Sequence, residues 1–373
     1  MANRTGAGLR IVLTGGGTAG HINPALALAE ELLARGHEVY FGGTPQGVEA
    51  KIVPAMGIPF KAFNAKGFVR SKPWTLITSG IKILQSIRDA EGWLKEIKAD
   101  GVVGFGSYAS VSCGKAAKKL GIPLVLHEQN SVMGMSNIDL SKYASKVCLT
   151  YARAAEGHNI APEKIVITGN PVRRSVLAAT REEGRAYLGI PEDATVLLVF
   201  GGSLGARHIN QAITRMKADL LSRPNLHIVQ ICGPTQYDSV VEELALTPEE
   251  AARWQLFSYQ DHMDMVYAAA DCIVSRAGAS SLAEISALGI PAILVPYPYA
   301  TADHQTHNSE ALVAAGCAKL VADADLDAPT FAPQVLELVD DPELRARMRA
   351  CALSADTRGA AGRLADVVVN TFK

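Results

Sequence analysis

The sequence predicts an α/β protein with two doubly wound parallel-sheet domains that face each other across a cleft. Apolar strand patterns alternate with helical patterns from end to end, as in repeated β-α-β units. Two glycine-rich turns, Thr14–His21 and Gly201–Ala206, follow a strand and open a helix at matching places in the two halves. Such turns present backbone N–H groups at a helix N-terminus, where they can bind an anion. The length of 373 residues suits two domains with separate cores.

The first half of the chain shows this alternation clearly. Strands are predicted over Leu9–Leu13, His37–Phe41, Asp100–Phe105, Ile122–Leu126 and Ile165–Thr168, and a helix over Ala25–Ala34. Asn170-Pro171 stops regular structure just after the last of these strands, so we expect the domain boundary near Gly169–Arg173. Residues 1–170 are therefore assigned to an N-terminal domain.

The second half repeats the scheme, and residues 171–355 are assigned to a C-terminal domain. Strands are predicted over Thr195–Phe200, Leu226–Ile231, Asp271–Ser275 and Pro291–Val295, with helices after Gly205, Thr235, Ala279 and Gln305. Further helices are predicted at Glu343–Arg349 and Gly362–Phe372. Residues 356–373 are assigned to a terminal helix that can cross back to the N-terminal domain.

Gly-Ile-Pro tripeptides recur along the chain, beginning at Gly57, Gly121, Gly189 and Gly289. Glycine can take the left-handed conformation that ends a helix, and the proline then prevents the helix from resuming. We predict a helix-to-strand turn at each of these tripeptides.

Composition excludes several classes of protein. Thirty-six basic and 37 acidic residues give a net charge of -1, which provides no general field for attracting nucleic acid. The six cysteines never form a C-x-x-C pair, which favours reduced packing residues in a cytosolic protein. No apolar run approaches the ~20 residues of a membrane span, and Met1–Gly8 has no apolar leader. We expect a cytoplasmic protein.

The first glycine-rich turn satisfies G-x-G-x-x-G at Gly15–Gly20, which is typical of a dinucleotide site. Such a site also needs a carboxylate at the end of the second strand to bind the ribose. That strand ends at Tyr40–Thr44 without one. A dinucleotide site is therefore disfavoured but remains an alternative. A second alternative is a turn whose glycines only let the helix and the strand pack closely.

Two candidates for a general base lie in the first half. His21 follows the first turn at the start of a helix, where it can act as a base or merely cap the turn. Glu128 belongs to His127-Glu128-Gln129-Asn130, directly after a strand, where open α/β sheets bind ligands. A third glycine-rich loop, Gly104–Tyr108, is expected at the same sheet edge, so the ligand is expected to be large.

The second half has its own polar loops after strands. In Ser275–Glu284, Glu284 lies one turn into a helix, where it can accept bonds from ribose hydroxyls or simply complement the helix dipole. The polar loop Pro296–Asn308 follows the next strand. Asp323–Asp327 is interpreted as a solvated acidic loop in preference to a cation site, so no metal is expected.

Six motifs in order resemble those of the MurG family of N-acetylglucosaminyltransferases, which have the GT-B architecture of two Rossmann-like domains and convert lipid I to lipid II. The motifs lie between Arg10 and Gly316, and they are Gly16–Pro24, Gly104–Tyr108, His127–Asn130, Gly169–Arg173, Gly201–Ala206 and Asp303–Asn308. Three departures from the family pattern occur, at Ala19, at Ser107 and at the pair Ser112-Cys113. They affect the expected fit of the acceptor and leave the reaction class unchanged.

The resemblance implies where UDP-GlcNAc binds. The second domain would hold most of the donor, with Ser203 and Arg173 near the diphosphate, Gln260 near the uracil, Glu284 on the ribose and Gln305 on the sugar hydroxyls. The remaining implied contacts are Ala279, Ser280, Ser281, Leu282 and Ala283 around the nucleotide and sugar, and Thr18, Ala19, Gly20 and Asn130 from the first domain.

The resemblance also implies the chemistry and the partners. His21, or alternatively Glu128, would deprotonate the C4 hydroxyl of lipid I, and UDP would leave with inversion and without a cofactor or metal. Because lipid I is a polyprenyl lipid, the protein would bind the anionic cytoplasmic face of the membrane peripherally. The basic and aromatic stretch Lys66–Leu84 has the composition of such a segment, although an ordinary amphipathic helix would look similar.

Alternatives from other classes remain at this stage. A sugar-nucleotide epimerase would share the fold and the donor site. A dinucleotide-dependent oxidoreductase would bind NAD(P)H, and a sugar-nucleotide binder would show no turnover.

Overall fold

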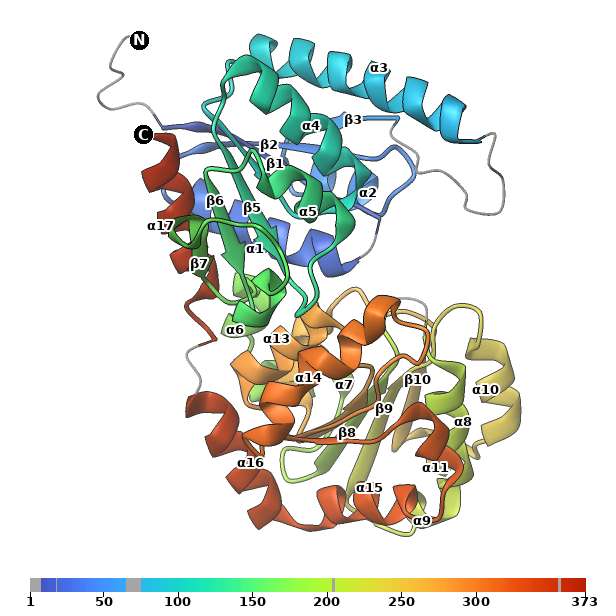
Figure 1. The fold of residues 1–373 in the computed structure, drawn as a ribbon. Coiled ribbons are helices and arrows are strands. Elements are labelled where there is room, and N and C mark those ends of the chain that lie inside the picture. The colour runs from blue at the N-terminus through green and yellow to red at the C-terminus, as the bar shows by residue number, and fades with distance from the viewer. Residues whose placement is uncertain (1–7, 18, 65–74, 203–204, 355–356) are drawn as a thin grey trace. The chain divides into compact units, whose positions relative to one another are not determined.

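The computed structural model describes residues 8–17, 19–64, 75–202, 205–354 and 357–373 (Figure 1). These residues form two compact units. Unit 1 comprises Met1–Arg173 and Arg358–Lys373, and unit 2 comprises Arg174–Thr357.

Unit 1 is built on a parallel sheet of seven described strands in the order β3-β2-β1-β4-β5-β6-β7. The order reverses between β1 and β4, which is the arrangement of a doubly wound sheet with its ligand site at the switch point. The strands are β1 (Arg10–Thr14), β2 (Glu38–Gly43), β3 (Phe60–Ala62), β4 (Gly101–Gly104), β5 (Leu124–Glu128), β6 (Lys146–Leu149) and β7 (Ile165–Ile167).

Helices cover both faces of this sheet. Alternate residues of β1 point to opposite faces, so Ile11 and Leu13 pack with α1 and α17 while Val12 packs with α3, α4 and α5. The helices of unit 1 are α1 (Ala19–Ala34), α2 (Glu49–Ala55), α3 (Thr75–Glu96), α4 (Ser107–Leu120), α5 (Met135–Ser141), α17 (Ala360–Phe372) and the short 3₁₀ turns η1 (Ala152–Ala155) and η2 (Pro162–Lys164).

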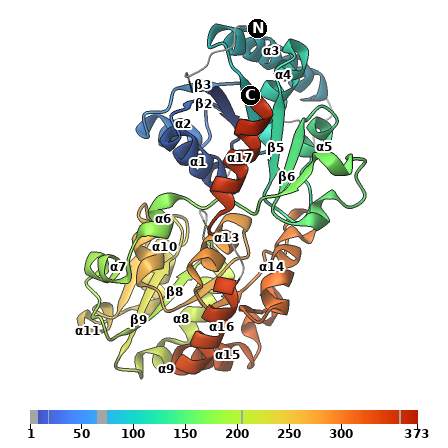
Figure 2. The ribbon, with the colours of Figure 1, turned by 90° about the vertical axis from the view of Figure 1, so that its left-hand side faces the viewer.

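Helix α17 follows unit 2 in the sequence but packs in the core of unit 1, beside α1 (Figure 2). Its buried face includes Leu364, Val368 and Phe372. A Cβ at Gly101 would overlap the Phe372 ring, so the helix lies directly on the start of β4. The helix is therefore a structural part of the unit that holds β1 and α1.

Unit 2 repeats the same sheet with six described strands, all parallel, in the order β10-β9-β8-β11-β12-β13. The switch point here lies between β8 and β11. The strands are β8 (Thr195–Phe200), β9 (Leu226–Ile231), β10 (Trp254–Phe257), β11 (Cys272–Ser275), β12 (Ala292–Leu294) and β13 (Ala318–Leu320).

The two faces of β8 again carry different helices. Leu197 and Val199 pack with α8, α10 and α15, whereas Phe200 contacts Tyr267 of α12 at a ring distance of 5.8 Å. The helices of unit 2 are α6 (Arg174–Ala178), α7 (Arg181–Leu188), α8 (Arg207–Arg215), α9 (Lys217–Leu221), α10 (Tyr237–Leu244), α11 (Pro248–Ala251), α12 (Met263–Ala269), α13 (Ala279–Leu288), α14 (His304–Ala314), α15 (Phe331–Asp340), α16 (Pro342–Ser354) and the 3₁₀ turns η3 (Thr301–Asp303) and η4 (Asp323–Asp327).

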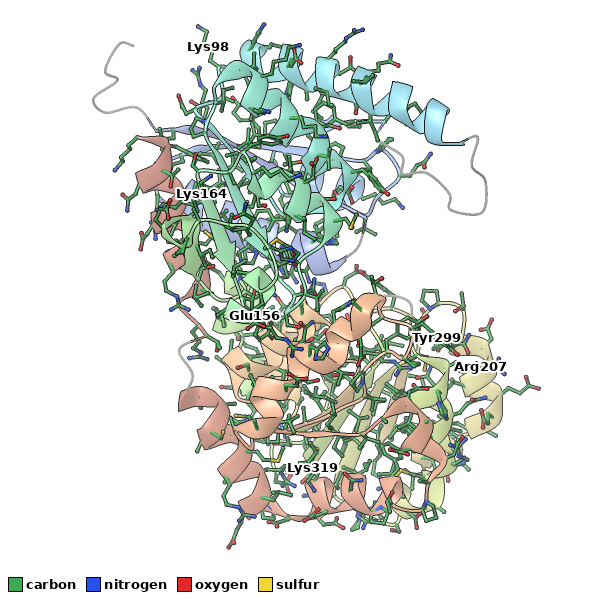
Figure 3. All side chains as sticks on the ribbon, viewed as in Figure 1. Lys98, Glu156, Lys164, Arg207, Tyr299 and Lys319 are labelled. Carbon is green, nitrogen blue, oxygen red and sulfur yellow. The ribbon has the colours of Figure 1, made fainter. Side chains whose placement is uncertain are left out.

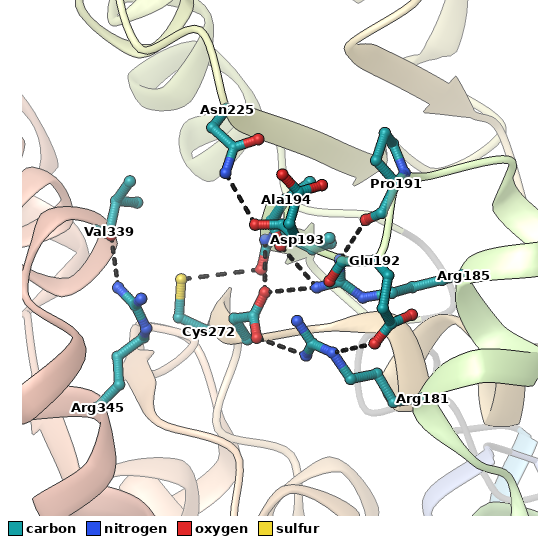
Figure 4. Close-up of polar contacts among 12 residues, drawn as sticks. Arg181, Arg185, Pro191, Glu192, Asp193, Ala194, Asn225, Cys272, Val339 and Arg345 are labelled. Atoms are coloured by element: carbon teal, nitrogen blue, oxygen red, sulfur yellow. Dashed lines mark hydrogen bonds and ion pairs between the residues drawn. The ribbon is translucent and has the colours of Figure 1, made fainter.

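A buried ion pair fastens the amino edge of the sheet in unit 2 (Figure 4). Asp271, just before β11, accepts hydrogen bonds from Arg185 at 2.9 Å, from Arg181 at 2.6 Å and from the backbone N–H of Val196 at 2.8 Å. Burial is the main cause that lowers the pKa of Arg185, whose side chain also donates to the backbone carbonyl of Ala194. These charges lie at the opposite edge from the loops after β8 and β11, so we assign them a structural role.

The predicted α/β class with two doubly wound sheets is confirmed. The glycines of the Gly-Ile-Pro tripeptides have φ values of +73°, +68°, +64° and +66°, as predicted for residues that end helices. Four strands were not predicted, namely β3, β6, β10 and β13, which have three or four residues each.

Candidate active site

The first predicted loop is the turn between β1 and α1, at the carboxyl edge of the sheet in unit 1. Gly17 has a φ of +91°, which favours glycine. Thr18 lies outside the described residues, as does the side chain of Ala19, where α1 begins. Gly20 and His21 follow in the first turn of α1 and are half-buried. The structure therefore confirms that His21 lies at the start of a helix.

A buried carboxylate that the sequence analysis missed lies beneath this turn. Glu49, the first residue of α2, accepts hydrogen bonds from Thr44 N at 2.9 Å, from Thr44 Oγ1 at 2.7 Å and from Gly17 N at 3.4 Å. Glu49 belongs to α2, so the end of β2 itself carries no carboxylate, as expected from the sequence. Because Glu49 is fully buried and occupied by these donors, it is not placed to bind a ribose, and a dinucleotide site remains disfavoured.

The loop between β4 and α4 lies against His21. A Cβ at Gly106 would stand 3.0 Å from His21 Cδ2 and 3.1 Å from its Nε2, so the imidazole lies over the backbone of this glycine. The next residue, Ser107, has a φ of +78°, a conformation that strains any residue with a side chain. The structure thus brings together two of the three loops predicted in unit 1.

The third loop follows β5, and Glu128 holds it in place. One carboxylate oxygen of Glu128 accepts from the backbone and side-chain nitrogens of Asn130 at 3.1 and 3.2 Å. The other accepts from Gly134 N at 2.9 Å and from Asn137 Nδ2 at 2.8 Å. The side chain is buried, and its lone pairs are taken up by neutral donors from the loop it precedes. This geometry suits an anchor for Asn130 better than a mobile base.

His127, the neighbour of Glu128, is a packing residue. Its Nε2 lies 3.0 Å from the carbonyl oxygen of Gly169, and its Nδ1 lies 3.1 Å from Gln129 Nε2. This pairing requires a proton on Nε2 and a lone pair on Nδ1. Complete burial lowers the pKa of His127 to about 4, so the ring is neutral at pH 7.

Arg173, predicted to lie near the diphosphate, is the last residue of the first segment of unit 1. Its side chain is half-buried, and its Nε is buried without a hydrogen-bond partner among the described residues. The folded chain alone therefore leaves this buried donor unsatisfied.

The matching loop in unit 2 is the turn between β8 and α8. A Cβ at Gly201 would overlap the backbone of Ala206, and a Cβ at Gly205 would overlap the carbonyl of Cys232. These close approaches explain why both positions are glycine. Ser203 lies outside the described residues.

The loop between β11 and α13 carries Glu284, whose carboxylate is buried and fixed. Tyr267 of α12 donates its phenolic hydrogen to Glu284 Oε2 at 2.9 Å. Tyr267 was not singled out from the sequence, because it lies on a different element. The other predicted residues here occupy the first turns of α13, with Leu282 and Ala279 buried and Ser280, Ser281 and Ala283 half-buried.

Gln260 lies in the loop between β10 and α12 and is buried. Its Oε1 accepts hydrogen bonds from Tyr187 Oη at 3.1 Å and from His262 N at 3.0 Å. The Tyr187 and His262 rings are 5.5 Å apart, so α7 packs against this loop. These two hydrogen bonds to Oε1 fix the orientation of the Gln260 side chain.

Gln305 is the second residue of α14, and its Oε1 accepts from Tyr297 N, in the loop after β12, at 2.9 Å. Tyr299 is 82% exposed, and Figure 3 shows it at the surface of this loop. Ala302 and Asp303 have φ values of +52° and +50°, so the backbone is strained just before Gln305. Strain of this kind persists only where the surroundings fix the loop.

The acidic loop at Asp323–Asp327 differs from the expectation of a solvated loop. The Asp323 side chain is only 16% exposed, and it pairs with His208 at 2.8 Å and with Arg276. Burial alone would raise its pKa, but the hydrogen bonds from His208 and Arg276 hold the pKa of Asp323 below its ordinary value. Asp327 pairs with His208 and Arg215. These contacts tie η4 to α8 and to the loop after β11.

Among the described residues, no group of three or more His, Cys, Asp or Glu side chains could hold a metal ion. Within the same residues, no helix is both long and apolar enough to cross a membrane. The stretch Lys66–Leu84 lies outside the described residues up to Trp74, and from Thr75 to Ile81 only the backbone is described. Leu84 of α3 is 63% exposed.

Residues 11–149 match the Glycosyltransferase family 28 N-terminal domain, and residues 196–364 match the Glycosyltransferase family 28 C-terminal domain. A relative from Halothermothrix orenii is 37% identical over 373 residues, which cover 98% of this chain and 100% of the relative. It is named UDP-N-acetylglucosamine--N-acetylmuramyl-(pentapeptide) pyrophosphoryl-undecaprenol N-acetylglucosamine transferase.

Two solved structures are also similar. The crystal structure of Acinetobacter baumannii MurG has a TM-score of 0.73 and 29% identity, covering 97% of this chain and 99% of that chain. A UDP-GlcNAc 2-epimerase from Neisseria meningitidis, bound to UDP-GlcNAc, has a TM-score of 0.67 over 97% of this chain and 99% of that chain. At 16% identity the epimerase shares the fold alone. The two parallel sheets are of the GT-B type, and the chain belongs to the MurG family of glycosyltransferases.

Proposed function

We propose that this protein transfers N-acetylglucosamine from UDP-GlcNAc to the C4 hydroxyl of the MurNAc unit of lipid I, forming lipid II for peptidoglycan synthesis. The observation that carries the proposal is the full-length relationship, at 37% identity, to a transferase named for this reaction. The helix-start position of His21 and the buried Tyr267–Glu284 pair support it, because they supply a base and an oriented ribose acceptor.

In this proposal unit 2 binds most of the donor. The N-terminus of α8 and Ser203 bind the diphosphate, and Arg173 adds a positive charge. Glu284 accepts hydrogen bonds from the ribose hydroxyls through its carboxylate, which Tyr267 orients. The other donor contacts are Gln260 near the uracil, Gln305 on the sugar hydroxyls, Ala279 to Ala283 around the nucleotide and sugar, and Thr18, Ala19, Gly20 and Asn130 from unit 1.

His21 is the proposed general base. Its imidazole takes the proton of the acceptor C4 hydroxyl while that oxygen attacks the anomeric carbon from the face opposite UDP. The bond from the anomeric carbon to the diphosphate oxygen breaks, and its electron pair leaves with UDP. Inversion at the anomeric carbon gives a β-1,4 link. The N-terminus of α8 and Arg173 stabilise the charge that develops on the leaving diphosphate.

Glu128 was the alternative base, and its contacts favour a different role. A carboxylate that accepts from Asn130, Gly134 and Asn137 would have to break these bonds to reach a substrate proton. We assign Glu128 the role of holding Asn130 at the carboxyl edge of β5.

The acceptor is a lipid, so we also propose peripheral attachment to the anionic cytoplasmic face of the membrane through Lys66–Leu84. The basic and aromatic composition of this stretch and the exposure of Leu84 support this. Sedimentation with vesicles tests it. Binding to vesicles that contain anionic lipid should exceed binding to neutral vesicles and should fall in Lys72→Glu and Lys82→Glu.

The reaction is tested with purified protein, labelled UDP-GlcNAc and a lipid I analogue. We expect UDP release only when the acceptor is present, and a severe loss of turnover in His21→Ala and in Glu284→Ala. His158→Ala in unit 1 and Glu243→Gln in unit 2 serve as controls and should retain activity. Unchanged turnover in both site variants would remove this assignment of residues.

The same assay separates the alternatives. Conversion of UDP-GlcNAc without acceptor would indicate an epimerase, and binding without turnover would indicate a sugar-nucleotide binder. A shifted nicotinamide fluorescence on adding NADPH would indicate an oxidoreductase.

A further inference from the structure

We propose that Glu49 is a positioning residue that fixes the turn between β1 and α1, and thereby the place of His21. This inference rests on the proposed function, because its kinetic consequence is a displaced base. Glu49 does not contact substrate in this scheme and acts only through the backbone of the turn.

The contacts of Glu49 join three separate parts of unit 1. The residue begins α2, its Oε1 accepts from both donors of Thr44 just after β2, and its Oε2 accepts from the backbone of Gly17. The carboxylate therefore ties the end of β2 to the turn that precedes α1. Backbone contacts of this type set the path of the chain and leave the fold of the sheet itself unchanged.

The space around Glu49 is built to accept this side chain. A Cβ at Gly16 or at Gly47 would overlap its carboxylate, and a Cβ at Gly43 would stand 2.6 Å from its Cγ. Glycine at these positions lets the backbone close around a fully buried acid. Among the described residues, no ion pair to Glu49 occurs within 4.0 Å, so neutral donors alone hold it.

A buried carboxylate without a cationic partner among the described residues is costly, and a purely structural position is usually filled at lower cost by an apolar group. Three N–H and O–H donors face its two oxygens, which matches a carboxylate and not an amide. Glutamine would present its NH₂ group to Gly17 or to Thr44 and push the turn away. Because α1 starts directly after this turn and His21 lies over Gly106, such a shift moves the imidazole.

The test compares Glu49→Gln with Glu38→Gln in the full-length protein. Glu38 begins β2 and its side chain is 52% exposed, so it controls for the loss of one acid from the same unit. We expect the kcat of Glu49→Gln to fall about 10- to 100-fold, as for a base displaced by about 1 Å. The KM for UDP-GlcNAc should rise much less than kcat falls, because the donor binds mainly to unit 2 and only part of it contacts this turn.

Hydrogen exchange gives a readout that does not depend on activity. Amides of the segment Thr14–Ile22 should exchange faster in Glu49→Gln than in the wild type and in Glu38→Gln, while segments of unit 2 remain unchanged. If the wild-type protein is inactive with lipid I, the proposed function is wrong, but the exchange result for Glu49→Gln is not affected. Wild-type exchange and wild-type kcat in Glu49→Gln would overturn the inference itself.

Thr44→Val provides a milder variant in case Glu49→Gln does not fold. It removes one donor to Oε1 and keeps the backbone donor, so it should lower kcat less than Glu49→Gln does, again with a smaller effect on the KM for UDP-GlcNAc. Glu49 would be a residue that only stabilises the fold if donor binding and kcat fell equally and exchange became faster throughout unit 1. That outcome would also overturn the inference.

Discussion

Tyr267 Oη and Glu284 Oε2 are 2.9 Å apart inside unit 2, and both side chains are buried. The phenol fixes one oxygen of the carboxylate, so the rotamer of Glu284 is set before any ligand arrives. Phe200 packs against the Tyr267 ring and holds the phenol in turn. Binding to a carboxylate that is already oriented avoids the entropy loss of ordering it.

This pair gives the first prediction. Tyr267→Phe keeps the ring against Phe200 and removes only the hydrogen bond, so UDP-GlcNAc should bind about tenfold more weakly, the effect of losing about 1.4 kcal/mol. Isothermal titration with UDP-GlcNAc measures the change. Tyr143→Phe in unit 1 is the control and should bind the donor normally. Wild-type affinity in Tyr267→Phe would show that Glu284 needs no such partner.

Ser107 gives a prediction of increased stability. Its φ of +78° strains the backbone, and its Oγ is buried without a hydrogen-bond partner among the described residues. Ser107→Gly relieves both, and we expect a gain of about 0.5–1 kcal/mol after the greater freedom of glycine in the unfolded chain is counted. Urea denaturation measures it. Ser110→Gly, within α4, should instead destabilise the protein, because Ser110 Oγ donates to the Thr14 carbonyl.

His127 makes the stability of unit 1 depend on pH. Burial lowers its pKa to about 4, whereas the unfolded chain takes up the proton near pH 6.5. Between these values the unfolded state binds more protons, so the free energy of unfolding should fall as the pH drops from 6.5 towards 4, by up to about 3 kcal/mol. His127→Gln should show a flatter dependence than the wild type in denaturation at pH 7, 5.5 and 4.5. Parallel curves for the two proteins would mean that His127 is not the group responsible.

Asp271 tests the buried ion pair of unit 2. Asp271→Asn leaves the buried Arg185 without its counter-ion, and we expect a loss of about 3 kcal/mol in the free energy of unfolding. The exposed pair of Arg223 and Asp340 offers a matched control. Asp340→Asn should cost less than about 1 kcal/mol, because water screens that pair. Similar losses in the two variants would argue against the special role of burial.

The sequence predicted the features that depend on local chemistry. Each Gly-Ile-Pro tripeptide lies at the end of a helix. A left-handed glycine and a nearby proline stop a helix through the conformations of adjacent residues, so the local sequence is enough to predict the turn. The bounds of β8 and β9 were predicted to the residue. Each strand is a run of six residues that are almost all buried in the sheet. The position of Ser107 was noted as a departure from a family glycine, and its positive φ explains why glycine suits it.

What could not be predicted depends on contacts between distant elements. β3 and β13 have three residues each, including Lys61 and Lys319, and they become strands only because a neighbour in the sheet pairs with them. Glu49 lies 32 residues from Gly17, and no spacing rule links α2 to the turn before α1. The Tyr267–Glu284 contact joins two helices in the same way.

Helix α17 has a consequence for how the molecule is made. Residues on both sides of unit 2 in the sequence complete one core, so unit 2 is an insertion within unit 1. During synthesis from the amino end, unit 2 emerges whole while the core of unit 1 still lacks Leu364 and Phe372. Deleting α17 should therefore destabilise unit 1, which carries His21 and Glu49, and should leave the core of unit 2 complete.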